Sequence, residues 1–294
     1  MTYSDYKLSA STYKSFKECP KKIAHKLANT PRDPATADSY RARDIGSVIH
    51  KLLEFKALQP TLYLDYMLLE HTITELTKDF KIQTTMELAD KYTIMVSVTV
   101  GFRYLDYLFK AGHEIIGAEV PIEDNDTKGY VDLVLKEPVH EGILVCDYKT
   151  VSSFSDDLSS WETDPQILHY AYFYPDCKVR IIQLLKVNNA LKDDEEPMDY
   201  VNRMLNYKAY YGKQKGLKRE LCRIIDIAPS QEHVGAFASI FRQTASLVRE
   251  LPSDPNEVEG NCDSCIHLLY KTKCDYYNTC HKDKTVPNVQ AYYF

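Results

Sequence analysis

The sequence predicts an α/β fold with a helical N-terminal region, a core that contains β-strands, and a cysteine-rich C-terminal tail. Apolar residues recur at helical spacing until about residue 111, and short runs rich in β-branched residues follow. A helix and a further strand are expected after these runs, which is the alternation typical of layered α/β cores. Four of the eight cysteines lie between residues 262 and 280, a clustering that favours metal binding.

Length and composition indicate a globular protein with a full core. With 294 residues, 44% of them hydrophobic and 27% charged, we expect a single domain over residues 1–294. Its expected parts are a mainly helical segment 1–112, a β-hairpin and core 113–190, a helical segment 191–260 and the tail 261–294.

Hydropathy and charge exclude some classes of protein. No apolar run approaches the roughly 18–20 residues that cross a bilayer, and the N-terminus lacks the apolar stretch of a secretory signal. We therefore expect a cytoplasmic protein with no membrane partner. The net charge of −6 argues against a non-specific nucleic-acid coat protein, because such a domain is normally basic. It does not exclude a metal-dependent enzyme with an acidic catalytic face.

The first part of the chain carries the signals of successive helices. Ser9 or Ser11 is placed to cap a helix that runs toward Glu18, and Pro20 suits the first turn of the next helix. The polar, proline-containing segment 30–44 predicts a loop. Three amphipathic or apolar helices are then expected, at residues 44–58, 62–82 and 86–111.

Strand-like runs begin after these helices. Asp164 and Pro165 form the cap and first turn of a later helix, and Ser230 is placed to cap another long one. The expected strands cover residues 114–123, 129–136, 143–150 and 179–187.

Two of these runs form an antiparallel hairpin whose register decides the chemistry. If Lys136 pairs with Ile143, then Asp132 lies opposite Asp147, and both share one face with Lys149. The other face is apolar and is expected in the core: Val131, Leu133, Leu135, Leu144, Cys146 and Tyr148.

Carboxylates placed directly across a ladder have Cβ atoms only about 4.5–5.5 Å apart and repel each other. Mg²⁺ or Mn²⁺ converts this repulsion into a binding site, because these hard cations prefer carboxylate oxygen. Lys149 then lies where it can orient or deprotonate a water molecule, or stabilise charge on a phosphate. The alternative is that Asp132 and Asp147 are solvated and Lys149 is their salt-bridge partner.

The segments GYVDLVLK and ILVCDYKT resemble the active-site hairpin of PD-(D/E)XK nucleases, in the RecB-like branch that includes phage RecE-type exonucleases. Three other segments occur in the order of that branch. GSVIH is similar to its G-x-x-x-H helix, AEVPIE to a strand that bears a glutamate, and QILHY to its Q-x-x-x-Y helix. The resemblance covers roughly residues 10–175 and implies a restriction-endonuclease-like core.

The resemblance implies a metal-dependent deoxyribonuclease, and within this branch an exonuclease that acts on DNA ends in recombination or repair. A single-strand annealing protein, or another recombination protein, is then a partner besides DNA. Glu54, on the helix of the implied histidine ligand, is expected to be solvated. The implied site comprises the Mg²⁺ or Mn²⁺ ligands His50, Glu119, Asp132 and Asp147, and the catalytic or DNA-approaching residues Lys149, Gln166 and Tyr170.

Cys19, in the context ECPKK, resembles the N-terminal cysteine of RecB-like nucleases such as AddB and the CRISPR adaptation nucleases. In those families this cysteine and three near the C-terminus hold a 4Fe–4S cluster. The tail here departs from their C-x2-C-x5-C pattern, since it reads C-x2-C-x8-C-x5-C. Five cysteines therefore compete for four places, and a zinc site from the last four alone is the alternative: Cys19, Cys262, Cys265, Cys274 and Cys280. The other three, Cys146, Cys177 and Cys222, are expected to be packing residues.

Basic residues cluster at 21–26 and at 213–219, and the second cluster follows Tyr207, Tyr210 and Tyr211. Such interleaving suits a groove for a nucleic-acid strand, while a solvated helix face is the alternative.

Two other classes of function remain. One is a DNA-binding module that has kept the nuclease fold without catalysis, and the intact aspartates and lysine argue against it. The other is a zinc-stabilised interaction protein, in which Lys149→Ala would be silent and Cys262→Ser would abolish function.

Overall fold

The computed structural model describes most of the chain, and its residues fall into two compact units. Unit 1 comprises Met1–Tyr40, Asp124–Lys128 and Ser239–Phe294, and unit 2 comprises Arg41–Glu123 and Gly129–Ala238. The single domain expected for the whole chain stays a prediction. The described residues are 3–31, 40–79, 81–82, 84–139, 142–154, 157–187, 189–206, 208–209, 217–218, 220–260, 266–267, 272–274 and 276–280.

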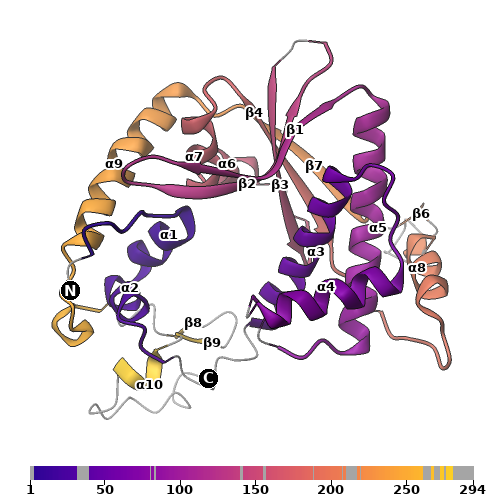
Figure 1. Ribbon diagram of the computed structural model, residues 1–294, viewed down its shortest axis with the longest axis horizontal. Coiled ribbons are helices and arrows are strands. Elements are labelled where there is room, and N and C mark those ends of the chain that lie inside the picture. The colour runs from indigo at the N-terminus through magenta and orange to yellow at the C-terminus, as the bar shows by residue number, and fades with distance from the viewer. Residues whose placement is uncertain are drawn as a thin grey trace. The chain divides into compact units, whose positions relative to one another are not determined.

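A five-stranded mixed sheet lies in unit 2 (Figure 1), with the strand order β1-β2-β3-β4-β7. The predicted register of the hairpin is confirmed, since Lys136 pairs with Ile143 in the antiparallel β2–β3 ladder. β3 and β4 are parallel, so the chain has to cross over between them, and helices α6 and α7 lie in that connection. The strands are β1 Glu114–Glu123, β2 Lys128–Lys136, β3 Ile143–Val151, β4 Lys178–Leu185 and β7 Cys222–Ile227.

Helices before the sheet supply the rest of the core of unit 2. Asp65 caps α4 by accepting a hydrogen bond from the Leu68 N–H at 2.7 Å, and Glu87 and Asp90 form a capping box at the start of α5. These helices overlap the ranges that the apolar periodicity predicts, although α3 begins at Tyr40, inside the segment 30–44 that is expected to be a loop. The α/β fold class is confirmed. Their bounds are α3 Tyr40–Leu58, α4 Tyr66–Lys78, α5 Leu88–Lys110, α6 Leu158–Glu162, α7 Pro165–Phe173 and α8 Pro197–Leu205.

One face of the hairpin is apolar and buried, as its register predicts. The side chains of this face pack in one core with the apolar stripe of α3, which includes Val48, Ile49 and Leu52. Alternation along the strands therefore directs the polar hairpin residues away from this core. The core-face residues of the hairpin are Leu133, Leu135, Leu144, Cys146 and Tyr148, and Val131 is also buried.

The edge strand β7 corrects one expectation, because segment 191–260 was expected to be helical. β7 pairs antiparallel with β4, and Arg180 forms a two-hydrogen-bond ion pair with Asp226 across that ladder. The segment also contains α8, the short strands β5 Lys208–Ala209 and β6 Leu217–Lys218, and α9 Gln231–Arg249.

Unit 1 joins the two ends of the chain. Ser9 caps α1 through the Thr12 N–H, and Arg249 at the end of α9 bonds Asp126 and the Tyr6 carbonyl. Residues from three distant segments of the sequence are thus tied together within this unit. Its elements include α1 Ala10–Glu18, α2 Pro20–Leu27, the 3₁₀ helix η2 Pro255–Glu257, the short strands β8 Ile266–His267 and β9 Thr272–Lys273, and α10 Tyr277–Cys280. Among the described residues, none of the helices combines the length and apolarity that crossing a membrane requires.

Two helical glycines give opposite predictions for stability. A Cβ added at Gly101 on α5 would lie 2.5 Å from Leu53 Cδ2 and 3.5 Å from Leu184 Cδ1, inside the core. Overpacking costs about 1–3 kcal/mol, which exceeds the gain of about 1 kcal/mol in helix propensity, so Gly101→Ala is expected to destabilise. At Gly235 on α9 an added Cβ meets no described neighbour within 4 Å, and Gly235→Ala is expected to stabilise. Urea unfolding measures both, and shifts of the same sign would contradict this packing.

Candidate metal centre and active site

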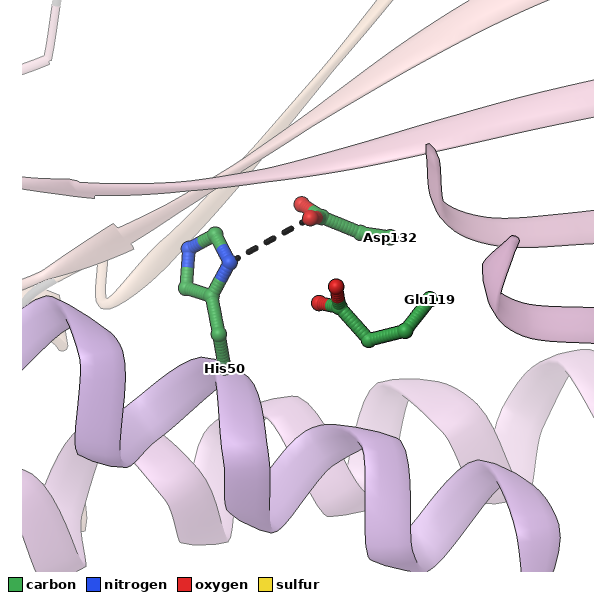
Figure 2. Close-up of side chains that lie close together, drawn as sticks. All are labelled: His50, Glu119 and Asp132. Atoms are coloured by element: carbon green, nitrogen blue, oxygen red, sulfur yellow. Dashed lines mark ion pairs between the residues drawn. The ribbon is translucent and has the colours of Figure 1, made fainter. Parts of the chain in front are cut away.

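Among the described residues, one group of three potential metal-ligating side chains stands out: His50, Glu119 and Asp132. Their candidate ligand atoms lie within 4.8 Å of one another, and His50 Nδ1 is 3.3 Å from Asp132 Oδ1. Figure 2 shows the imidazole reaching up from its helix toward the Asp132 carboxylate, with the Glu119 carboxylate beside both. An imidazole nitrogen and two carboxylates are a ligand set that suits a divalent cation such as Mn²⁺ or Mg²⁺.

The fold fixes two of these side chains from the core. His50 follows the fully buried Ile49 on α3, and its ring lies edge-to-face on the ring of Tyr148, with centroids 5.9 Å apart. Asp132 Oδ2 accepts a hydrogen bond of 2.7 Å from the backbone N–H of Tyr148. The carboxylate is therefore held against the neighbouring strand while its other oxygen faces His50.

Glu119 reaches the centre through an unusual backbone conformation. Its φ of 49° lies in the left-handed region, which non-glycine residues rarely adopt and which costs on the order of 1 kcal/mol. Strained residues of this kind cluster at functional sites. This one lies where β1 brings its carboxylate beside Asp132.

A second set of side chains forms a closed hydrogen-bonded ring next to this group. Lys149 Nζ donates to Gln166 Oε1 and forms an ion pair with Asp147 Oδ2, both at 2.7 Å. Gln166 Nε2 donates to the Tyr170 hydroxyl at 2.6 Å, and that hydroxyl donates to Asp147 Oδ1 at 3.0 Å. Two strand residues and two helix residues one turn apart on α7 thus fix one another's orientation.

The carboxylates of the centre influence one another's protonation. Burial, together with the nearby Asp132 charge, raises the pKa of Glu119 to about 7. Burial also raises the pKa of Asp147, and Asp132 adds to the rise although Lys149 opposes it. For Asp132 burial acts in the same direction, but the charge and hydrogen bond of His50 outweigh it and lower the pKa. The charge of Asp132 thus disfavours the charged forms of Glu119 and Asp147, and a divalent cation would relieve this repulsion.

The structure thus brings the residues singled out in the sequence into two adjoining sets. His50, Glu119 and Asp132 form the candidate metal-ligating group. Asp147 is not part of it, and its carboxylate contacts Lys149 and Tyr170. Glu54 is paired with Lys51 at 2.7 Å and is half-buried rather than fully solvated.

Tyr148 is the contributor that sequence reasoning places only in the core. Its ring packs on His50 and its N–H holds Asp132, so it supports both candidate ligands. The signal available in the sequence is its position between Asp147 and Lys149, where a backbone N–H faces the neighbouring strand.

The cysteine tail is described only in part. Cys19 is buried and Cys274 and Cys280 are partly buried, while Cys262 and Cys265 lie outside the described residues. Cys146 and Cys177 are buried, and Cys222 is partly buried.

The two basic clusters are also described only in part. Of the second cluster with its tyrosines, the described residues include only Leu217 and Lys218. In the first cluster, Lys22 lies 4.0 Å from Glu18 and Lys26 donates to the Thr12 hydroxyl.

The family model of the PD-(D/E)XK nuclease superfamily matches residues 7–280 of the chain. The match includes every residue of the two sets described above and extends to Cys280. No curated protein matches the chain.

Proposed function

Because the chain belongs to the PD-(D/E)XK nuclease superfamily, we propose that it hydrolyses phosphodiester bonds in DNA at the centre formed by residues of α3, β1, β2 and β3. The observation that carries the proposal is the convergence of His50, Glu119 and Asp132 beside the ring that contains Lys149. An ion-pair cluster gains nothing from gathering two partly buried carboxylates around one point, whereas a cation site does.

We assign the cation to His50, Glu119 and Asp132, with Asp147 as the neighbouring carboxylate. A bound Mg²⁺ or Mn²⁺ supplies positive charge for the phosphate and an acidified water molecule. The chain's own residues set the geometry. Asp132 is fixed by the Tyr148 N–H, and Lys149 is held by Asp147 and Gln166, so its ammonium group is oriented before substrate arrives.

We propose that Gln166 and Tyr170 position the side chains of Asp147 and Lys149. Tyr170 is 1% exposed and donates to Asp147, while the Gln166 amide links Tyr170 to Lys149. Both residues thereby fix the Asp147 carboxylate and the Lys149 ammonium group relative to each other.

We further propose that the protein is an exonuclease of the RecB-like branch that acts on DNA ends in recombination or repair. The support is the order of the G-x-x-x-H, glutamate strand, D-x-K and Q-x-x-x-Y segments along the chain. On the same support, a single-strand annealing protein or another recombination protein is the expected partner. The cysteine tail is proposed to hold a 4Fe–4S cluster, with zinc as the alternative.

The test is incubation of the purified protein with linear and with covalently closed circular DNA, in Mg²⁺, Mn²⁺ or EDTA. We expect metal-dependent loss of the linear form alone, since a closed circle offers no end. Cleavage of both forms would make the protein an endonuclease. No cleavage of either form in any metal would contradict the nuclease proposal. An Asp193→Asn variant, changed at an exposed aspartate remote in sequence from the centre, serves as the preparation control.

A further inference from the structure

An exposed tyrosine lies on the strand that carries Asp132, two residues before it. Tyr130 on β2 is 61% exposed, and within the described part of the chain its side chain has no hydrogen bond, ion pair or ring contact. β2 is nevertheless an inner strand of the sheet, between β1 and β3. The ring therefore presents a large apolar surface to solvent from a strand whose backbone is paired on both sides.

The packing of its two neighbours directs Tyr130 outward. Val131 is fully buried, and a Cβ added at Gly129 would lie 3.3 Å from ring atoms of His169 on α7. Residues 129 and 131 thus both face packed side chains. Because side chains alternate along a strand, Tyr130 lies on the opposite side of β2, and the next residue on that side is Asp132.

Tyr130 also lies level with Lys149 in the hairpin. The last pair of the β2–β3 ladder is Leu133–Cys146. Three residues further along each strand, Tyr130 and Lys149 occupy corresponding positions. A separation of two residues along a strand is about 6–7 Å, so the tyrosine is close to the candidate ligand Asp132 as well as to the level of the lysine.

We propose that the Tyr130 ring stacks on a nucleobase next to the phosphate that is cleaved, and so positions the DNA strand at the centre. This inference rests on the proposed function and assigns a substrate-binding residue to it. Stacking on an aromatic ring accepts any base and needs no positive charge, which suits a chain with a net charge of −6. A base inside a duplex is already paired and stacked, so the ring is expected to favour an unpaired nucleotide at this position.

The first test is single-turnover cleavage of a single-stranded oligonucleotide in Mn²⁺ at increasing protein concentration. Tyr130→Ala is expected to raise the half-saturating concentration by about 5- to 100-fold, the loss of one stacked base, with little change in the maximal rate. Tyr130→Trp keeps an aromatic face and is expected to retain wild-type half-saturation. The thermal stabilisation by Mn²⁺ is expected to be the same in Tyr130→Ala and wild type, because Asp132 is unchanged. Tyr107→Ala, at a tyrosine of 64% exposure on α5, is the matched control.

A series of oligonucleotides with one abasic position each then identifies the partner of the ring. In the wild type, one abasic position beside the cleaved phosphate is expected to raise the half-saturating concentration about as much as Tyr130→Ala does. In Tyr130→Ala the same abasic position is expected to have no further effect, because ring and base act as one pair.

Three results would separate the possible failures. Wild-type half-saturation in Tyr130→Ala would overturn the assignment of Tyr130, and so would a wild type that is insensitive to every abasic position. The second result comes from the unaltered protein, so misfolding of a variant does not affect it. Absence of cleavage by the wild type in every metal would instead overturn the proposed function, and this inference with it.

Discussion

Asp132→Asn is expected to lower DNA cleavage at least a hundredfold and to remove the stabilisation that Mn²⁺ or Mg²⁺ gives the folded protein. Asp132 Oδ1 faces His50 and its Oδ2 accepts the Tyr148 N–H, so the carboxylate is both a candidate ligand and a fixed one. Asparagine has nearly the same shape and its amide oxygen can still accept that hydrogen bond. The substitution therefore removes the charge while it keeps the hairpin.

The readout compares thermal unfolding with and without metal, because the difference cancels any change in the metal-free fold. A ligand at 100 times its Kd stabilises a protein by about 2.7 kcal/mol, and the wild type is expected to gain on that order at saturating Mn²⁺. Asp132→Asn is expected to gain almost nothing and to lose at least a hundredfold in single-turnover cleavage. An equal metal-dependent gain in the variant would show that the cation binds elsewhere, and Asp193→Asn controls for unspecific effects of the substitution.

The sequence predicts the hairpin well because its information is local. β-branched runs, a short connection and strict alternation determine the register that places Lys136 opposite Ile143, and with it the polar and apolar faces. Helix caps such as Ser9 and Asp164 are equally local, since each bonds an N–H two or three residues away.

Contacts between distant segments are harder to predict from the sequence. β7 is a six-residue edge strand, and it pairs with residues of β4 that lie 38 to 48 positions earlier in the chain. The Arg180–Asp226 ion pair is one of these long-range contacts. The register predicts that Asp147 lies on the metal-binding face, but the residues that occupy its carboxylate are Lys149 and Tyr170, and Tyr170 comes from a separate helix. The left-handed backbone conformation of Glu119 likewise could not be predicted from the sequence, because glycine is the residue that usually marks such a position.

Lys149→Ala is expected to reduce cleavage by about a hundredfold to a thousandfold while leaving metal binding in place. The magnitude follows from the loss of one preorganised donor to the charge that develops in a transition state. The substitution also removes the counter-ion of Asp147, whose side chain is 1% exposed. Removing one partner of a buried ion pair costs about 3–5 kcal/mol. The cost is expected to be smaller here, because Lys149 is itself 28% exposed.

These two effects of Lys149→Ala separate when metal is varied. If Asp147 lies close enough to the cation to be compensated by it, Mn²⁺ recovers the lost stability but not the lost cleavage. Lys149→Arg keeps the positive charge beside Asp147, so it is expected to restore stability without metal. It is expected to restore cleavage only in part, because a planar guanidinium presents its donors in a different geometry from the ammonium group that contacts Asp147 and Gln166. Lys110→Ala, at an exposed lysine at the end of α5, is the matched control. Wild-type cleavage by Lys149→Ala would assign the lysine to the fold alone and leave the carboxylates to act without it.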